Sequence, residues 1–180
     1  MDFNQILTPG DVEDGFVNVV VEIPAGSKNK IEWNREKAVM QLERIEPSIF
    51  AKPTNYGFIP QTLDEDGDEL DAIIITDEPL PTGLFVRAKI IGVMKFEDNG
   101  EIDDKIIVVP DDSVGMEGEI NTLGCISSQK IKQITHHFNN YKNLQNPGST
   151  LVKGWAGKDE AREIIYRSIK RWNDEKDRQA

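Results

Sequence analysis

The amino-acid sequence predicts an α+β domain that is mainly β, a small antiparallel barrel or sandwich with two helices packed outside it. Up to about residue 120, short apolar runs alternate with turn-forming residues, which is typical of an all-β core. After that point, apolar residues recur every three or four positions, as on one face of a helix. No linker divides the 180 residues, so we expect one domain over 1–180, with the barrel core in about 15–120 and the helical part in about 121–175.

The expected strands are rich in β-branched residues or alternate apolar with polar ones. They lie at 17–23, 30–33, 40–44, 71–76, 85–96 and 105–109. Pro24 ends the first strand, and an acidic turn around Asn99-Gly100 separates the last two. The continuous apolar run that follows Asp71 predicts a strand that is buried on both faces.

Two amphipathic helices are expected in the second part. In the first, apolar residues recur from Ile131 to Leu144, and Asn146-Pro147-Gly148 ends the helix. A brief extended piece follows at 151–155. The second helix has its apolar stripe between Ala161 and Trp172, and it runs out into a charged tail. Each stripe needs an apolar partner, so both helices are expected to pack on the barrel.

Composition and charge exclude several classes of protein. With 38% hydrophobic and 29% charged residues, the chain is too apolar for a disordered tail and too polar for a membrane protein. The N-terminus lacks the pattern of a signal peptide, and a single cysteine, Cys125, permits no internal disulfide. The net charge of −11 disfavours binding to a phosphate backbone. We therefore expect a cytoplasmic protein with no nucleic-acid or membrane partner.

The densest chemical feature is the acidic run from Asp64 to Asp71. A solvated loop is the plain alternative, and it stays open at this point. Asp71 opens a buried strand, where an unpaired charge is costly, and Gly67 permits a tight turn that gathers the acids. An EF-hand is excluded, because with Gly67 at the sixth loop position the first and twelfth ligands would be Thr62 and Ile73.

A second acidic cluster, Glu97 to Asp104, lies in the turn between two expected strands. Alone it reads as the solvated tip of a hairpin. If the two turns meet at one mouth of the barrel, the carboxylates repel one another and require hard divalent cations, for which Mg²⁺ is the natural choice. The side chains that could hold phosphate are Lys30, Arg44, Tyr56, Lys105, Tyr141 and Lys142. Taken alone, each of these is more often a surface residue, except Tyr56, which could equally be a core residue or a hydroxyl donor.

Together these residues resemble the soluble family I inorganic pyrophosphatases of prokaryotic type. The most specific match is Asp66-Gly67-Asp68-Glu69-Leu70-Asp71, which fits that family's D-G-D-x-x-D signature before an apolar strand. The supporting segments follow the family's order over roughly residues 15 to 172. They are 21–24, 30–32, Arg44, 53–59, 92–95, Asp98 with Asp103 and Lys105, and 137–142.

The resemblance implies an OB-like five-stranded barrel with extra strands and two C-terminal helices packed outside. It implies hydrolysis of pyrophosphate to two orthophosphates with several Mg²⁺ ions per site, for which Mn²⁺ or Zn²⁺ can substitute. A homo-oligomer is expected, with a hexamer favoured. The alternative function is an OB-like oligonucleotide-binding module, which the 7% aromatic content and the negative charge disfavour.

The resemblance also assigns roles to individual residues. Asp68 is the expected general base. The expected metal ligands are Asp66, Asp71, Asp98, Asp103 and Glu32, with Glu22 as a supporting residue. The residues expected to hold the two phosphoryl groups are Lys30, Arg44, Tyr56, Lys105, Tyr141 and Lys142.

Three positions depart from the family's pattern. Lys52 stands where many members have a tyrosine, which keeps a phosphate donor but removes a phenol. Asn99 replaces an acid of some members, and Asn140 replaces a histidine near a subunit contact. His136 and His137 are expected to serve as interface or helix-packing residues and not as metal ligands.

Overall fold

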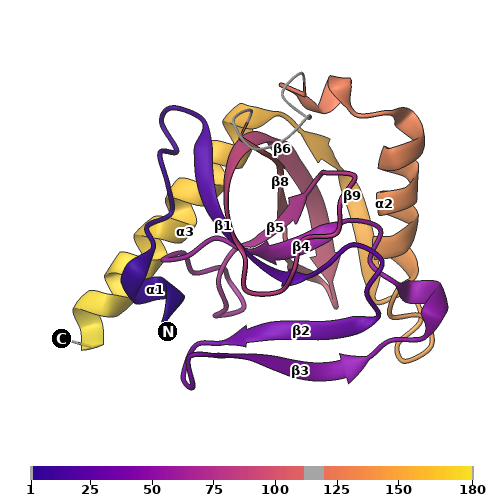
Figure 1. The fold of residues 1–180 in the computed structure, drawn as a ribbon, viewed down its shortest axis with the longest axis horizontal. Helices are drawn as coiled ribbons and strands as arrows, with labels where there is room; N and C mark the ends of the chain where they lie inside the picture. Colours follow the sequence, from indigo (N-terminus) through magenta and orange to yellow (C-terminus); the bar gives the residue numbers. More distant parts are fainter. Residues whose placement is uncertain (1, 112–119, 180) are drawn as a thin grey trace.

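The computed structural model describes residues 2–111 and 120–179, and five strands in it close into a ring (Figure 1). Around the ring the strands are β1 (Phe16–Ile23), β4 (Asn55–Phe58), β5 (Asp71–Ile74), β8 (Lys105–Pro110) and β6 (Phe85–Asp98), which returns to β1. Shifts of register in the β1–β4 and β6–β8 pairings make the ring irregular. The expected mainly β fold with an OB-like five-stranded barrel is confirmed.

One pairing in the ring is parallel. Ala72 of β5 lies opposite Ile106 of β8, and the two strands run in the same direction. The expectation of a purely antiparallel barrel is therefore wrong for this pair. Its cause lies in the connection, because the chain runs through the whole of β6 before it reaches β8, and a parallel neighbour requires such a crossover.

Four further strands extend this arrangement. β2 (Asn29–Asn34) and β3 (Val39–Ile45) form a separate hairpin that lies beside the ring (Figure 1), and the short β7 (Glu101–Ile102) pairs with the end of β6. β9 (Thr150–Ala156), expected only as a brief extended piece, pairs with β6 along its whole length. The sheet thus includes residues from the part of the chain that was expected to be helical.

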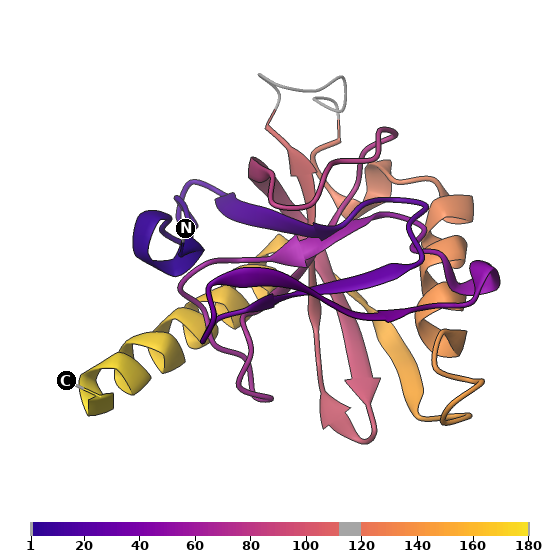
Figure 2. The same ribbon diagram turned by 60° about the horizontal axis from the view of Figure 1, so that its bottom comes forward.

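The two long helices, α2 (Ser128–Asn140) and α3 (Lys158–Gln179), pack on two sides of the ring, as expected (Figures 1 and 2). A short α1 (Phe3–Ile6) and two 3₁₀ turns, η1 (Ser48–Phe50) and η3 (Leu123–Cys125), complete the described elements. None of the helices in the described ranges combines the length and the apolar character needed to cross a membrane.

The structure corrects the expected end of the first long helix and agrees with that of the second. α2 ends at Asn140, with Tyr141 as its C-cap, and it does not reach Leu144, whose side chain is 71% exposed. Leu144 therefore belongs to no apolar stripe. α3 continues past Trp172 to Gln179, as expected of a helix that runs out into the charged tail, and an i,i+4 ion pair of 2.6 Å between Lys170 and Asp174 supports its last turns.

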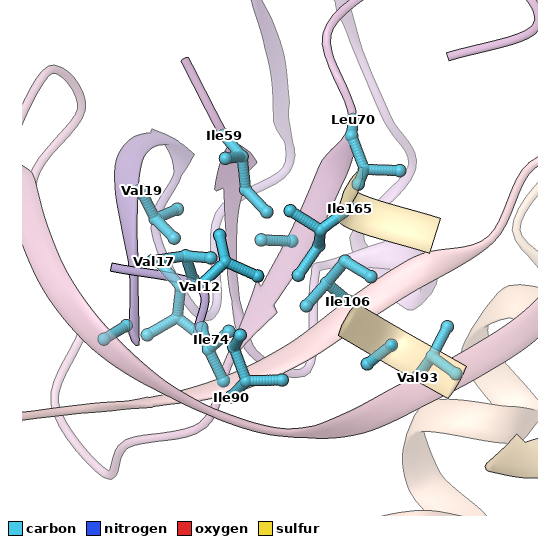
Figure 3. Packing of buried hydrophobic residues seen from close by; sticks show 14 of the residues in the cluster. Val12, Val17, Val19, Ile59, Leu70, Ile74, Ile90, Val93, Ile106 and Ile165 are labelled. Atoms are coloured by element: carbon cyan, nitrogen blue, oxygen red, sulfur yellow. The ribbon is translucent and has the colours of Figure 1, made fainter. Parts of the chain in front are cut away.

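The core consists of two layers that share the ring strands. Ile74 and Ile106 point into the ring with Ile165 of α3, where Figure 3 shows them packed together. Ile73 and Phe138 belong to the second layer, between the ring and α2. Since consecutive residues of β5 enter different layers, the prediction that this strand is buried on both faces is confirmed.

Gly57 allows β4 to approach β1. A Cβ atom at this position would lie 2.0 Å from the carbonyl oxygen of Val20, which no side chain tolerates. The neighbouring Tyr56 also lies in β4, and its ring packs against the second core layer.

Candidate active site

A cavity of about 520 Å³ collects residues from the ring and from the β2–β3 hairpin. Asp66 and Asp71 of the first acidic cluster line it together with Asp98 and Asp103 of the second. The structure thus brings the two acidic turns to one place. This convergence was the condition on which the sequence-based prediction of a cation site depended.

Nearly all site residues predicted from the sequence line this cavity. They are Glu22, Lys30, Glu32, Tyr56, Asp66, Asp68, Asp71, Asp98, Asp103, Lys105, Tyr141 and Lys142. Arg44 does not line it, because its guanidinium is engaged with Glu43 at 2.7 Å and Glu46 at 2.6 Å. Its role as a phosphate ligand remains a prediction.

The first acidic turn owes its shape to a glycine. Gly67 has a φ of +94°, in the region that favours glycine, and this allows the backbone N–H of Asp68 to donate to Asp66 Oδ1 at 3.0 Å. The backbone N–H of Asp64 donates to the carbonyl of Asp68 at 2.7 Å, which closes the turn. The tight turn expected at Gly67 is confirmed.

Lysine side chains lie among the carboxylates of the cavity. The buried Lys105 donates to Asp71 at 2.5 Å and also pairs with Asp103, and Tyr56 donates its hydroxyl to Asp71. Burial opposes the charge of Lys105, but the two carboxylates outweigh it and raise the pKa of this lysine above its ordinary value. Lys105 is therefore held in its charged form inside the site.

The same pattern recurs at the other sides of the cavity. Lys142, which follows the end of α2, pairs with Asp98, and Lys30 pairs with both Glu32 and Glu43. Each predicted phosphate-binding lysine thus contacts at least one carboxylate. A site with this composition can hold cations and anions side by side.

Asp68 and Glu22 lie where a negative charge is costly, so the pKa of each is raised. Burial raises the pKa of Asp68, and the charges of Asp66 and Asp71 raise it further. Burial and then the charge of Asp71 raise the pKa of Glu22 well above its ordinary range. Such mutual repulsion is what a bound cation would relieve.

The donor set fits hard divalent cations, because it consists of carboxylate oxygens that open to one cavity. Within residues 2–111 and 120–179, however, no three His, Cys, Asp or Glu side chains stand close enough together to hold a metal as they are. Asp71 and Asp103 instead share the ammonium group of Lys105, which contacts both carboxylates.

Sequence reasoning missed several cavity residues as site candidates, among them Glu43, Arg35 and Asp64. Glu43 reaches Lys30 only through the pairing of β2 with β3, which periodicity does not reveal. Arg35 comes from the turn of the same hairpin. Asp64 is the first residue of the acidic run, and burial raises its pKa to about 6.

Lys52, the departure at the tyrosine position, also lines the cavity. Its ammonium group lies over three aromatic rings, 4.3 Å from the centroid of Tyr56, 4.9 Å from that of Phe138 and 5.2 Å from that of Tyr141. Burial, with the nearby charge of Lys105, lowers the pKa of Lys52 to about 8. His137 is buried in the packing of α2 and stacks on Tyr141, whereas His136 is exposed.

Comparison with known proteins identifies the family. The family model described as inorganic pyrophosphatase matches residues 19–173. The chain is 63% identical to the inorganic pyrophosphatase of Haemophilus influenzae over 173 residues, which cover 96% of this chain and 98% of the relative. It is 60% identical to that of Neisseria meningitidis over 172 residues, covering 96% and 97% of the two chains.

Solved structures agree with the sequence relatives. The crystal structure of an inorganic pyrophosphatase from Neisseria gonorrhoeae matches with a TM-score of 0.92 and 61% identity, over 96% of this chain and 99% of that one. The enzyme from Thermus thermophilus matches with a TM-score of 0.85 at 32% identity, over 93% and 97% of the two chains. The protein therefore belongs to the family I inorganic pyrophosphatases of prokaryotic type, as the D-G-D-x-x-D run indicated.

Proposed function

We propose that this protein hydrolyses inorganic pyrophosphate to two orthophosphates in the cytoplasm, with Mg²⁺ as its main cation and Mn²⁺ or Zn²⁺ as substitutes. The observation that carries the proposal is the single cavity in which carboxylates alternate with lysines and tyrosine hydroxyls. Pyrophosphate bound with divalent cations has the matching composition, because its anionic oxygens need both cations and hydrogen-bond donors.

The residues that would hold the cations are Asp66, Asp71, Asp98, Asp103 and Glu32. Glu22 would support them from the base of the cavity, where it accepts a hydrogen bond of 2.6 Å from the backbone N–H of Trp33. Divalent cations bound here would supply Lewis acidity, lowering the pKa of a coordinated water and neutralising phosphate oxygens. The positions of the carboxylates would determine where the cations bind.

The donors of the cavity would hold the two phosphoryl groups. Lys30, Lys105 and Lys142 lie beside carboxylates, so their charges are already in the site before substrate arrives. Tyr56 and Tyr141 contribute hydroxyl groups at the cavity wall, and Arg44 would have to turn from Glu43 and Glu46 to take part. Such preorganised charges stabilise the transition state of phosphoryl transfer.

Asp68 would act as the general base. It lies on the tight turn between two proposed metal ligands, and its raised pKa makes the carboxylate a better proton acceptor than an ordinary aspartate. Asp68 would take the proton of the attacking water while the lysines hold the departing phosphate. A positioned base contributes roughly 10²–10⁴-fold to a rate.

Phosphate release tests the proposal directly. The purified protein is incubated with pyrophosphate with Mg²⁺, without added metal, and with EDTA, and orthophosphate is measured by malachite green. We expect product only in the Mg²⁺ sample. Absence of Mg²⁺-dependent product would exclude the proposed activity, and tight retention of single-stranded DNA on a filter at low salt would favour the oligonucleotide-binding alternative.

The proposed assembly is a homo-oligomer, with a hexamer favoured by the family resemblance. Light scattering on a size-exclusion column measures the mass in solution. A hexamer gives about six times the 20.3 kDa of one chain. A particle with the mass of a single chain would contradict the proposal.

A further inference from the structure

Arg35, in the turn that joins β2 to β3, contacts the acidic loop from the side of the hairpin. Its Nη2 donates to the carbonyl oxygen of Gly67 at 2.6 Å, and its Nη1 lies 3.7 Å from Oε1 of the buried Glu69. The carbonyl of Gly67 lies between Asp66 and Asp68 in the chain. Arg35 therefore contacts the backbone that carries a proposed metal ligand and the proposed general base.

The guanidinium of Arg35 is itself held by α3. Its Cζ lies 5.5 Å from the centroid of the Trp172 ring. Trp172 does not line the cavity, whereas Arg35 does. A planar guanidinium can donate to a carbonyl, pair with a carboxylate and lie over an aromatic ring at the same time, which a lysine cannot do equally well.

The neighbouring residue of α3 contacts the beginning of the same loop. Arg171 donates to the carbonyl of Leu63 at 3.0 Å and pairs with Glu65 at 3.0 Å. On the other side, Asn4 of α1 donates to Glu69 Oε1 at 2.6 Å. Figure 2 shows both ends of the chain on one side of the molecule. The two terminal helices thus meet the loop from outside the cavity.

We infer that Arg35, held by Trp172, is a positioning residue that keeps the Gly67 carbonyl, and with it Asp66 and Asp68, in the orientation needed to bind divalent cations. The inference rests on the proposed function, which assigns these aspartates to the metal site. Its consequence is that the last turns of α3 support cation binding although they lie outside the cavity. Residues that orient metal ligands from outside the first layer of contacts commonly affect metal affinity by about 10–100-fold when changed.

If Arg35 acted only through its charge, the metal affinity of an Arg35 variant would change in the opposite direction. Its positive charge lies near the proposed cation site and repels bound metal, so removing the charge would by itself tighten metal binding. If Arg35 acts by positioning, removing its side chain contacts weakens binding despite the loss of that repulsion. The sign of the change in the variant Arg35→Gln separates the two.

The experiment measures Mn²⁺ binding to the full chain by titration calorimetry without substrate. Besides Arg35→Gln, it uses Trp172→Ala, which leaves the net charge unchanged, and Trp172→Phe, which keeps an aromatic face. We expect Mn²⁺ affinity to fall by about 10-fold in Arg35→Gln and Trp172→Ala and to recover largely in Trp172→Phe. Amide hydrogen exchange of residues 63–68 in the metal-free variants should be faster than in the wild type.

A matched control is provided by Arg87. It lies 3.8 Å from the Phe16 ring centroid and pairs with Asp111, but it does not line the cavity. The variant Arg87→Gln should bind Mn²⁺ as the wild type does. Arg87→Gln also removes a contact with an aromatic ring and an ion pair. It therefore measures how much a general loss of stability affects Mn²⁺ binding.

Two outcomes would overturn the inference. Arg35→Gln could bind Mn²⁺ as tightly as the wild type or more tightly, or a folded Trp172→Ala could keep wild-type affinity and exchange rates. If Trp172→Ala does not fold, the Mn²⁺ affinity of Arg35→Gln tests the inference by itself. A wild-type protein that binds Mn²⁺ and releases phosphate leaves the proposed function intact whatever the variants do, whereas one that does neither overturns both.

Discussion

Lys105 joins the two acidic turns of the site, with its Nζ 2.5 Å from Asp71 Oδ2 and in contact with Asp103 as well. Its side chain is 3% exposed, so the ammonium is almost entirely removed from water. Asp71 comes from β5 and Asp103 from the turn that precedes β8, and these segments meet only because β5 and β8 are parallel neighbours. One buried cation thus compensates two carboxylates from distant parts of the chain.

Replacing Lys105 should destabilise the protein, because the two carboxylates that it pairs with would then repel each other. In Lys105→Met, Asp71 and Asp103 lose their shared cation, and we expect the metal-free protein to lose about 3 kcal/mol of unfolding free energy. Mg²⁺ should restore part of the loss, since a cation can replace the ammonium. Urea unfolding with and without Mg²⁺ measures both effects. Lys132→Met, at an exposed position of α2, is the control, and equal stability of the two variants would contradict the prediction.

Asp68→Asn tests the assignment of the base. The amide keeps the size of the side chain but cannot accept the proton of the attacking water, so kcat should fall by roughly 10²–10⁴-fold. The fold, measured by circular dichroism, and the binding of Mn²⁺ should remain close to the wild type. Asp77→Asn, at an exposed position outside the cavity, should keep full activity. A wild-type rate in Asp68→Asn would mean that another group is the base.

Lys52 should make pyrophosphate binding weaker at alkaline pH. Its pKa is lowered to about 8 by burial and by Lys105, so the side chain is charged below that pH and neutral above it. If the ammonium contacts a phosphoryl group, KM for pyrophosphate should rise as the pH increases through about 8. Lys52→Arg, whose guanidinium stays charged, should shift this rise to higher pH.

Lys52→Tyr restores the residue that many family members have, and it should change KM only modestly at neutral pH. Its KM should also lack the rise near pH 8. Complete inactivation would show that Lys52 does not occupy the tyrosine position of the family. A KM that varies with pH identically in all three proteins would show that the ammonium does not contact substrate.

His137 should make the protein less stable in mild acid. Burial lowers its pKa from 6.5 to about 3, with smaller contributions from Lys52 and His136. The unfolded chain therefore takes up a proton below about pH 6.5 that the folded chain does not, and stability is lost as the pH falls from about 6.5 towards 3. At pH 5 this amounts to about 2 kcal/mol.

The variant His137→Phe removes this titration but keeps a ring beside Tyr141. The Nε2 atom of His137 is buried without a hydrogen-bond partner among the described residues, so an apolar ring leaves no polar group unsatisfied. Between pH 7 and pH 5, wild-type stability in urea should fall by about 2 kcal/mol more than that of His137→Phe. His136→Gln should behave as the wild type, and equal losses in all three would refute the prediction.

The periodicity of apolar residues predicted the elements whose burial follows a regular pattern. It failed where a single contact determines whether a segment is a strand or where a helix ends. The strand at 71–76 was recognisable because apolar residues run continuously into both core layers. β4 was not, since Pro53 and Gly57 read as turn signals, and only the close approach to Val20 explains the glycine. Leu144 fits the helical spacing but lies beyond the C-cap at Tyr141, a boundary that spacing cannot reveal.

The sequence by itself determined the chemistry of this protein: an acidic run with a glycine at its turn, a second acidic cluster, and the lysines and tyrosines that phosphate requires. Residue types and local spacing suffice for that, because they depend on nothing beyond neighbouring positions in the chain. Only the tertiary structure decided that both acidic turns open to one cavity, that Lys105 lies between them, and that Arg35 and Trp172 hold the first turn from outside. These contacts join segments far apart in the chain, and they arise from strand pairing and helix packing that local patterns do not encode.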